Sequence, residues 1–233
     1  MGEKKRKEAS TKNWTKIFIG IFVAFFCVVF AVGMIISSTG TGWISGIVGV
    51  KPGDVVVLDY TLKDAQGNPL VTSDQVLYNR IKAAGYDIYG SKQMTITANQ
   101  SLTTPVFPMQ VYTSQSGWGD KYSIFASEYN AISSGIIGMK KNEKKTINVV
   151  SGIPLTQYWT ADQLRERKLN LSDVQVGTVI PLGVSENPGV ATDNSTTSYY
   201  IRLGEVTTKD ADGVTIDFSQ PIIDVSIYSI NGR

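Results

Sequence analysis

A long apolar run near the start of the chain follows a segment in which basic residues dominate. From Ile17 to Ile36, twenty consecutive residues carry no charge. A helix of that length reaches roughly 30 Å at about 1.5 Å per residue, which matches the hydrocarbon core of a bilayer. The pattern therefore predicts a single transmembrane helix over residues 17–37. A cleaved signal peptide is the alternative, although its apolar stretch is typically only about 7–15 residues long.

The charge around this run predicts its orientation. Residues 1–16 hold six Lys and Arg residues against two Glu residues, a net charge of +4. Because basic flanks of a transmembrane helix stay in the cytoplasm, the sequence predicts a single-pass protein of the cell membrane. Its basic tail is then cytoplasmic and its C-terminal region extracytoplasmic. Residues 38–52 are rich in Gly and Ser and predict a short linker that holds the folded part near the lipid bilayer.

Beyond residue 52 the pattern changes to short β-branched and aromatic runs separated by turn residues. The clearest is DVVVLDYTL at 54–62, which lies between Pro52-Gly53 and the turn at 64–68. Short helices are predicted after the N-cap residue Asp74 and after the capping box that begins at Thr160. The pattern as a whole predicts an α+β fold that is mainly antiparallel sheet. Further strands are predicted at 94–98, 106–112, 121–125, 144–150, 179–184, 198–207, 214–218 and 222–230.

Composition narrows the chemistry that the chain can perform. Histidine is absent, and the single cysteine, Cys27, lies within the apolar run. This excludes Ser-His-Asp and Cys-His catalysis, His-liganded zinc and an intramolecular disulfide. No calcium-loop pattern is present, so neither a metal nor a cofactor is predicted. Beyond residue 16 the chain has 16 basic and 18 acidic residues, a balance of −2 that gives no support for nucleic-acid binding.

The order of several motifs resembles the FKBP-type peptidyl-prolyl isomerases. Members of that family open with a G-D-x-V-x-V-x-Y-T strand and a D-G turn, to which PGDVVVLDYTLKDAQGNPL at 52–70 is similar. They continue with a short helix that ends in G-M-x-x-G-E-K, to which ISSGIIGMKKNEKKTINV at 132–149 is similar. Asn142 replaces the Gly of that motif. Asn is the residue other than Gly that most readily accepts a left-handed turn, so the change is compatible with the same backbone.

The C-terminal part resembles the branch of this family that carries an insert-in-flap domain, the SlyD type. The segment VTIDFSQPIID at 214–224 stands where that branch has V-x-x-D-x-N-H-P-L-A-G. The resemblance implies an FKBP-like antiparallel β half-barrel around a short helix, with an inserted small β-domain. The domains that it implies are 53–155 for the first part of the FKBP-like domain, including an insertion at 71–124, then 156–212 for the insert-in-flap-like domain and 213–233 for the final strands.

The resemblance also implies a ring-lined pocket for proline. Proline isomerisation needs no nucleophile, because the barrier is amide resonance and a dry apolar site favours the twisted amide. Val71 replaces the carboxylate typical of active members, and Ile132 stands where the family often has an aromatic floor. For each ring an ordinary core position is the alternative. The implied pocket residues are Tyr60, Leu70, Val71, Phe125, Tyr129, Ile132 and Tyr158.

The insertion at 71–124 lies outside the resemblance and is rich in aromatic residues. Exposed Tyr and Trp side chains suit protein recognition, while an enlarged sheet with these rings as its core is the alternative. The rings are Tyr78, Tyr86, Tyr89, Phe107, Tyr112, Trp118 and Tyr122.

Two functions from different classes follow. The first is a membrane-anchored, outward-facing isomerase and folding chaperone that acts on X-Pro bonds in unfolded or proline-containing extracytoplasmic polypeptides. The second is a catalytically degraded FKBP-like binding or accessory subunit, which contacts other membrane protein subunits through the 71–124 insertion and the transmembrane helix. A third alternative is a surface β protein of accidental similarity. It predicts that the strand at 54–62 does not pair with the segment that ends at Ile230.

Overall fold

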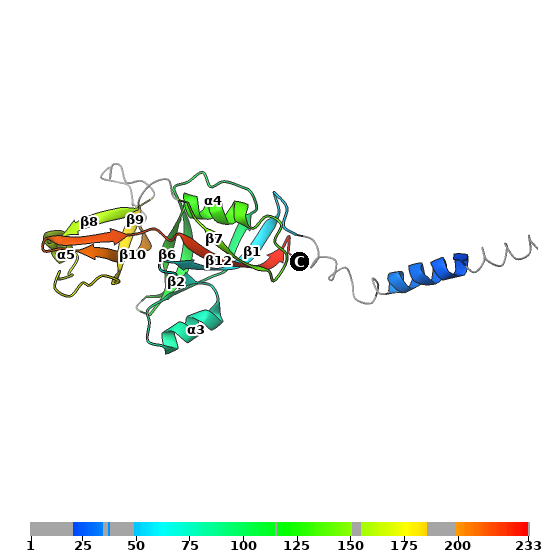
Figure 1. Cartoon of the computed structure of the whole chain (residues 1–233), viewed down its shortest axis with the longest axis horizontal. Coiled ribbons are helices and arrows are strands. Elements are labelled where there is room, and N and C mark those ends of the chain that lie inside the picture. The colour runs from blue at the N-terminus through cyan, green and yellow to red at the C-terminus, as the bar shows by residue number, and fades with distance from the viewer. Residues whose placement is uncertain are drawn as a thin grey trace, which may run out of the picture. The chain divides into compact units, whose positions relative to one another are not determined.

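The computed structural model describes residues 21–34, 37, 49–114, 116–150, 155–185 and 199–232 (Figure 1). The chain divides into two compact units, residues 1–48 and residues 49–233. In the first unit, residues 21–34 form a helix with exposed side chains. The predicted basic tail at 1–16 and most of the predicted linker at 38–52 lie outside the described residues.

The transmembrane helix that the sequence predicts at 17–37 is not found among the described residues. Among the described residues, no helix is long and apolar enough to cross a membrane. The predicted α+β fold with an N-terminal transmembrane helix over 17–37 is therefore wrong for the described part of the chain. The second unit is mostly β-sheet with short helices.

One twelve-stranded sheet organises the second unit. Its strands run in the order β7-β12-β1-β2-β3-β5-β6-β10-β11-β8, with β4 also paired to β1 and β9 to β10. The elements are β1 (Val55–Lys63), β2 (Pro69–Thr72), α3 (Gln75–Ala83), β3 (Tyr89–Ser91), β4 (Met94–Thr97), β5 (Val106–Thr113), β6 (Gly117–Phe125), α4 (Ala126–Gly135), β7 (Lys144–Asn148), β8 (Thr156–Thr160), α5 (Ala161–Glu166), β9 (Val179–Ser185), β10 (Tyr199–Lys209), β11 (Gly213–Asp217) and β12 (Ile222–Ile230).

The first and last strands of this unit lie side by side. β1 pairs with β12 in antiparallel register from Val56–Ile230 to Lys63–Ile222. This confirms the predicted pairing and contradicts the alternative of accidental similarity, which required these segments to be apart. Because side chains alternate between the two faces of a strand, Leu58 and Tyr60 of β1 point into the interior together with Val225 of β12.

The interior face of these strands packs against α4. In Figure 1, α4 lies above the strands and α3 below them. Tyr129 and Ile132 of α4 are buried in the same core cluster as the β1 and β12 side chains. The segment after α4 turns through Gly138, with φ 81°, and Asn142, with φ 65°. Asn142 thus adopts the left-handed conformation that was expected of a residue in place of Gly.

Residues 71–124 add strands to this sheet. β4 pairs with β1, β3 pairs with β2, and the β5–β6 hairpin continues the sheet towards β10. Met109, Val111, Tyr122 and Ile124 from this hairpin belong to the same core cluster as Tyr60. The insertion is therefore an extension of the main sheet. One of its aromatic residues, Tyr122, is a core residue, and Tyr89 and Phe107 are partly buried against the same core.

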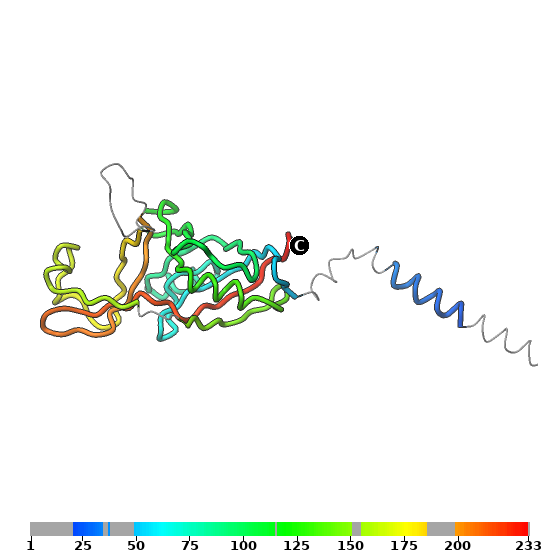
Figure 2. Tube along the Cα trace, turned by 90° about the horizontal axis from the view of Figure 1, so that it is seen from above, coloured from blue at the N-terminus to red at the C-terminus, as the bar shows by residue number. Residues whose placement is uncertain are grey.

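A smaller β lobe with its own core follows β7. We call residues 155–185 and 199–218 the distal lobe, and residues 49–150 and 219–232 the proximal lobe. Figure 2 shows the distal lobe, yellow to orange, beside the strands of the proximal lobe. The Thr160 side chain accepts from the Gln163 N–H and caps α5, which confirms the predicted capping box. The distal core consists of Trp159, Leu164, Val174, Ile180, Val206, Val214, Ile216 and Phe218.

Candidate functional site

Most residues of the implied proline pocket are core residues of the proximal lobe. Tyr60 is 2% exposed, while Val71 and Ile132 are 0% exposed. Leu70 and Tyr129 are also buried, and all five belong to one hydrophobic cluster. The structure therefore brings these side chains into one buried cluster.

The two remaining residues of the implied pocket lie elsewhere. Phe125 is half-buried at the end of β6, where it is the N-cap residue of α4. Tyr158 lies on β8 in the distal lobe, 46% exposed, and its hydroxyl donates to Asp210 Oδ1 at 2.9 Å. This hydrogen bond raises the pKa of Tyr158. Tyr158 therefore belongs to the surface of the distal lobe, outside the cluster that contains Tyr60.

The Tyr60 hydroxyl has no hydrogen-bond partner within the described part of the chain, although it is buried. The Ser91 hydroxyl is also buried and also has no hydrogen-bond partner among the described residues. Burial raises the pKa of Tyr60 well above its ordinary value, and the nearby Ser91 hydroxyl offsets this only in part. Tyr60 is therefore neutral at any physiological pH. Val71, which replaces the expected carboxylate, offers no polar group to this hydroxyl.

A buried ion pair joins the two lobes beside Phe125. Arg202 of β10 is 0% exposed, and its guanidinium donates to both Glu128 carboxylate oxygens, at 2.9 and 2.5 Å. It also donates to the carbonyl oxygens of Ser123 at 3.0 Å and Phe218 at 2.9 Å. The guanidinium lies 4.2 Å from the centre of the Phe125 ring. Through these contacts Arg202 links β6 and α4 of the proximal lobe to the distal lobe.

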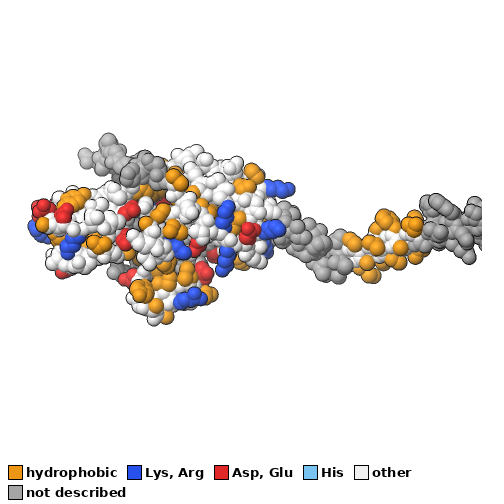
Figure 3. All heavy atoms as spheres, in the orientation of Figure 1, with side chains coloured by type: hydrophobic (Ala, Val, Ile, Leu, Met, Phe, Trp, Pro, Cys, Tyr) orange, Lys and Arg blue, Asp and Glu red, His pale blue; other side chains and the backbone are white. Residues whose placement is uncertain are grey.

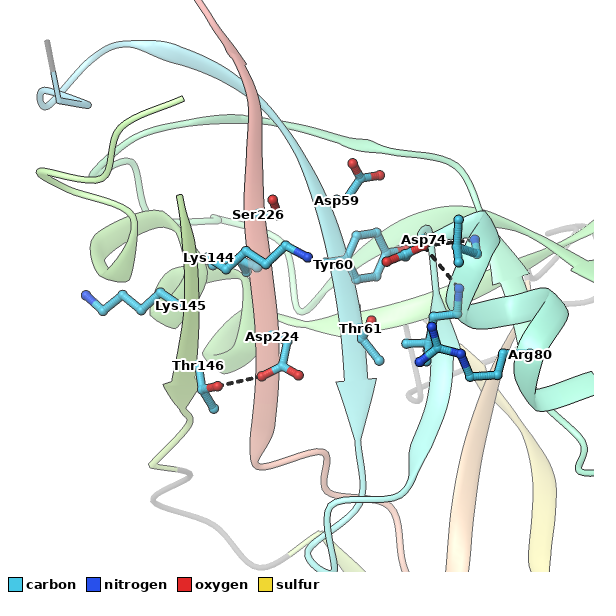
Figure 4. Close-up of a pocket in the computed structure, with 13 residues that line it drawn as sticks. Asp59, Tyr60, Thr61, Asp74, Arg80, Lys144, Lys145, Thr146, Asp224 and Ser226 are labelled. Carbon is cyan, nitrogen blue, oxygen red and sulfur yellow. Dashed lines mark hydrogen bonds between the residues drawn. The ribbon is translucent and has the colours of Figure 1, made fainter. Parts of the chain in front are cut away.

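A hollow in the proximal lobe lies on the opposite, outer face of the sheet. This charged groove has a volume of about 640 Å³, within the range of ligand sites. Figure 4 shows β7, β12 and β1 along its floor and α3 as its far wall. It is lined by Asp59, Tyr60, Thr61, Asp74, Val76, Leu77, Arg80, Lys144, Lys145, Thr146, Asp224, Val225 and Ser226.

The strand register explains why polar side chains gather in the charged groove. Thr61 of β1 is opposite Asp224 of β12, which is opposite Thr146 of β7. Asp59, Ser226 and Lys144 form the next such row. Because cross-strand partners share one face, both rows point away from the core and into the groove.

The three carboxylates of the charged groove already have partners. Asp224 accepts from Lys63 Nζ and from Thr146 Oγ1, each at 2.6 Å. Asp59 accepts from the Ser73 hydroxyl at 3.0 Å and from the Gln93 amide. Asp74 caps α3 by accepting from the N–H groups of its first turn, at 2.9 and 3.1 Å.

Two of the three basic side chains in the charged groove have no partner. Lys145 Nζ donates to the Gly135 carbonyl oxygen at 2.7 Å. Lys144 and Arg80 make no side-chain hydrogen bond or ion pair within the residues that the structure describes. The lining of the groove thus holds three carboxylates and three basic side chains, and of these basic side chains Lys145 alone has a hydrogen-bond partner among the described residues.

Asp224 gives the charged groove a measurable pH dependence. Burial raises the pKa of Asp224, but the hydrogen bonds from Lys63 and Thr146 outweigh burial and hold the pKa below its ordinary value. A carboxylate with a lowered folded-state pKa stabilises the protein above its unfolded pKa, about 3.9, and this contribution is lost as the pH falls through the folded value.

We therefore expect Asp224→Asn to lower the free energy of unfolding by about 0.5–1 kcal/mol at pH 7, the scale of a solvent-screened ion pair. The difference from the native protein should shrink as the pH falls below about 4. Urea unfolding at a series of pH values measures it. Asp162→Asn, in the exposed Asp162–Arg165 pair, is the control. A difference that stays constant down to about pH 2 would contradict the assignment.

An aromatic pocket lies on the other flank of α3. Its volume is about 340 Å³, and its walls include Tyr78 of α3, Tyr112 of β5 and Trp118 of β6. The Tyr78 and Tyr112 rings meet edge to face with centres 6.3 Å apart, and the Tyr112 and Trp118 ring centres are 5.6 Å apart. Lys92 Nζ lies 5.7 Å from the centre of the Trp118 ring. Trp118 is 47% exposed and Tyr112 36%, so this cluster is accessible.

Gly90 of β3 allows the Tyr78 ring to approach the sheet. It lies between Thr72 of β2 and Tyr112 of β5 in the strand register. A Cβ atom at this position would lie 3.3 Å from the Tyr78 ring. Glycine here therefore lets α3 lie close to the strands, and Figure 3 shows hydrophobic and basic side chains together on the surface that α3 forms.

Sequence reasoning did not identify the charged groove. Alternating polar residues in β1, β7 and β12 were the sequence pattern that could have indicated it. This pattern does not show which strands lie next to one another in the sheet. Arg202 and Glu128 were missed for the same reason, since they are 74 residues apart. Tyr78, Tyr112 and Trp118 were noted as candidate recognition residues, and the structure brings these three together.

Comparison with known proteins adds no family to this picture. The chain matches no protein-family model, and no curated protein matches it.

Proposed function

We propose that this protein is a polypeptide-binding module of FKBP-like architecture in which the proline-isomerase cleft is filled by its own core. The observation that carries the proposal is a contrast in accessibility. Tyr60, Val71 and Ile132, which the resemblance places in the catalytic cleft, are at most 2% exposed. Tyr112 and Trp118, from the insertion, line a surface pocket and remain accessible.

The chemistry of the aromatic pocket supports an extended, proline-containing occupant. Proline-rich segments hold a preformed extended conformation and dock into grooves that aromatic rings line. Large rigid rings bury area at a low cost in conformational entropy, so Tyr and Trp dominate binding energy at protein interfaces. The three rings of this pocket are already ordered by contacts with one another. The function that follows is recognition of a polypeptide by a binding or accessory protein.

An isomerase is the second candidate function, and one observation favours it. β1 pairs with β12 around α4, as the resemblance to the FKBP family requires. Activity would then require the filled interior beside Tyr60 to open. A proline-isomerisation assay on the full chain separates the two candidates. Acceleration that is abolished by Tyr60→Ala would favour the enzyme, and no acceleration would favour the binding module.

For the binding module, we expect Trp118→Ala to weaken binding of a proline-rich peptide about tenfold or more. The loss of a central aromatic contact typically costs more than about 1.4 kcal/mol, which corresponds to that factor. Fluorescence anisotropy of a labelled peptide measures the affinity. Tyr86→Ala is the matched control, because Tyr86 is 70% exposed and lies outside the aromatic pocket. Equal losses in the two variants would overturn the proposed site.

A further inference from the structure

We propose that Glu205 of β10 forms a pH-sensitive contact between the two lobes. When it is protonated, its carboxyl group donates a hydrogen bond to Asp64 and holds the distal lobe against the proximal lobe. When it is ionised, it repels Asp64 and loosens this contact. The inference goes beyond the proposed function and does not depend on the aromatic pocket.

Glu205 lies where β10 passes from one hydrophobic core to the other. Leu203, two residues before it, belongs to the proximal core cluster, and Val206, the next residue, belongs to the distal core cluster. The chain returns to the proximal lobe after Asp217, since Phe218 belongs to the distal core and β12 to the proximal core. In Figure 1 the orange-to-red segment that leads into β12 crosses the same junction. A charge at Glu205 therefore acts at the point where the lobes meet.

Three carboxylates line one small hollow at this junction. Glu205 of β10 and Asp217 of β11 are cross-strand partners, and Asp64 comes from the turn between β1 and β2. Like charges that lie directly opposite each other on neighbouring strands destabilise a sheet, so this arrangement favours protonation of one carboxyl group. The remaining lining residues are uncharged: Ala65, Gln66, Leu70, Thr207 and Ser219.

The hydrogen bonds of the three carboxylates indicate that Glu205 takes the proton. Asp64 is 4% exposed, and it accepts from the Gln66 N–H at 3.0 Å and from the backbone and side-chain N–H groups of Asn68 at 2.7 and 2.9 Å. Asp217 accepts from a backbone N–H at 2.8 Å. Donors of this kind stabilise an ionised carboxylate. Within the described part of the chain, no N–H group donates to the Glu205 carboxylate.

The surroundings of Glu205 shift its titration in the direction that this contact requires. Burial raises the pKa of Glu205, and the Asp64 and Asp217 carboxylates, together with a hydrogen bond to Asp64, raise it further. On the other side of β10, β9 places Val179 opposite Glu205 and contains no acidic or basic residue. A carboxyl group with a raised folded-state pKa stabilises the fold below its unfolded pKa, about 4.3, and this contribution is lost as the pH rises through the folded value.

A second contact between the lobes lies on the other side of β10. Arg202 and Glu205 are three positions apart in the strand, so their side chains point to opposite faces. The ion pair of Arg202 with Glu128 joins β10 to α4. The guanidinium stays charged, because an Arg side chain does not lose its proton in proteins. Ionisation of Glu205 thus loosens one side of the junction, and the distal lobe moves about the Arg202–Glu128 pair.

The test compares thermal unfolding of the full native chain and of Glu205→Gln at a series of pH values. Gln has a permanent N–H donor for Asp64 and no charge, so it imitates protonated Glu205 at every pH. We expect Glu205→Gln to raise the midpoint of unfolding by about 2–4 °C at about pH 8, the shift that a modest stabilisation gives in a chain of this size. At about pH 4 the two midpoints should coincide, because Glu205 is then protonated in the native protein.

Two further variants show whether the effect belongs to the junction. Glu166→Gln changes an exposed residue of α5 outside the hollow, and as the matched control it should keep the native pH dependence. Asp217→Asn removes one neighbouring charge but keeps an oxygen for the Ser219 N–H, so it should reduce the pH dependence without abolishing it. If Glu205→Gln is no more stable than the native protein at about pH 8, or if the difference is the same at about pH 4, the proposed contact is refuted.

Amide hydrogen exchange shows where the native protein loosens. After correction for the intrinsic effect of pH on exchange, residues 64–70 and 203–206 of the native protein should exchange several-fold faster than those of Glu205→Gln at about pH 8. Equal exchange in the two proteins would overturn the inference. The proposed function would stand in that case, because peptide titration of Trp118→Ala tests it independently.

Discussion

Glu128→Gln should lower the free energy of unfolding by about 3–5 kcal/mol, because it leaves the Arg202 charge buried without a counter-charge. Burial lowers the pKa of Arg202, but the adjacent Glu128 carboxylate outweighs burial and raises the pKa above its ordinary value. The guanidinium therefore remains charged at every pH at which the protein is folded. Gln keeps one acceptor oxygen for the Phe125 N–H, which lies 2.9 Å away in the native protein, but its NH2 group replaces the oxygen that accepts from Arg202 Nη2, so the substitution removes the counter-charge together with one acceptor.

Urea unfolding at pH 7 measures this effect, and two further variants make the result specific. Asp162→Asn removes one member of an exposed ion pair and should change stability by no more than about 1 kcal/mol. The double variant Glu128→Leu with Arg202→Met replaces the buried pair by apolar side chains and should recover most of the lost stability. If Glu128→Gln costs no more than the Asp162→Asn control, the buried ion pair does not hold the two lobes together.

Tyr60→Ala should lower the free energy of unfolding by about 3–5 kcal/mol, as expected for a large ring removed from a filled core. Tyr60→Phe should be neutral or stabilising, because the Tyr60 hydroxyl is buried without a hydrogen-bond partner among the described residues, and such a group costs about 1–3 kcal/mol. Of these two variants of the same ring, Tyr60→Ala alone is thus expected to destabilise the protein.

Thermal and urea unfolding of both variants, together with peptide titration, check this expectation. If Tyr60 instead lined an open cleft, the two variants would have different effects on stability and on peptide binding. Tyr60→Ala would then leave stability nearly unchanged and weaken peptide binding, and Tyr60→Phe would remove a hydrogen bond to the ligand. Ile132→Val, a small change elsewhere in the same core, is the control and should cost about 0.5–1.5 kcal/mol.

The sequence carried enough local information to predict several elements. The Asp74 N-cap and the Thr160 capping box predicted α3 and α5, because each cap is a short-range contact whose residues are adjacent in the sequence. The left-handed turn at Asn142 was expected from the resemblance, because Asn142 stands where the family motif has Gly and Asn accepts the same conformation. The pairing of β1 with β12 followed from the order of motifs along the chain.

Features that depend on distant contacts were not predictable in this way. The resemblance placed Tyr60 and Ile132 in a pocket, but β5 and β6 of the insertion supply further side chains to the same interior. Arg202 lies in a strand whose pattern gives no sign that Glu128 faces it. The charged groove required the neighbours of β12, and these become known only when β7 and β1 are placed on either side of it.

The pairing of the first strand of the second unit with its last strand has a consequence for biosynthesis. The Val55 N–H donates to the Asn231 side chain, a contact between residues 176 positions apart. A ribosome must therefore add 176 residues after Val55 before β1 gains this neighbour. Until then the apolar side of β1 stays without β12, and an unpaired strand edge invites association with other chains. The nascent protein is thus most vulnerable to aggregation in the interval between the emergence of β1 and the emergence of β12.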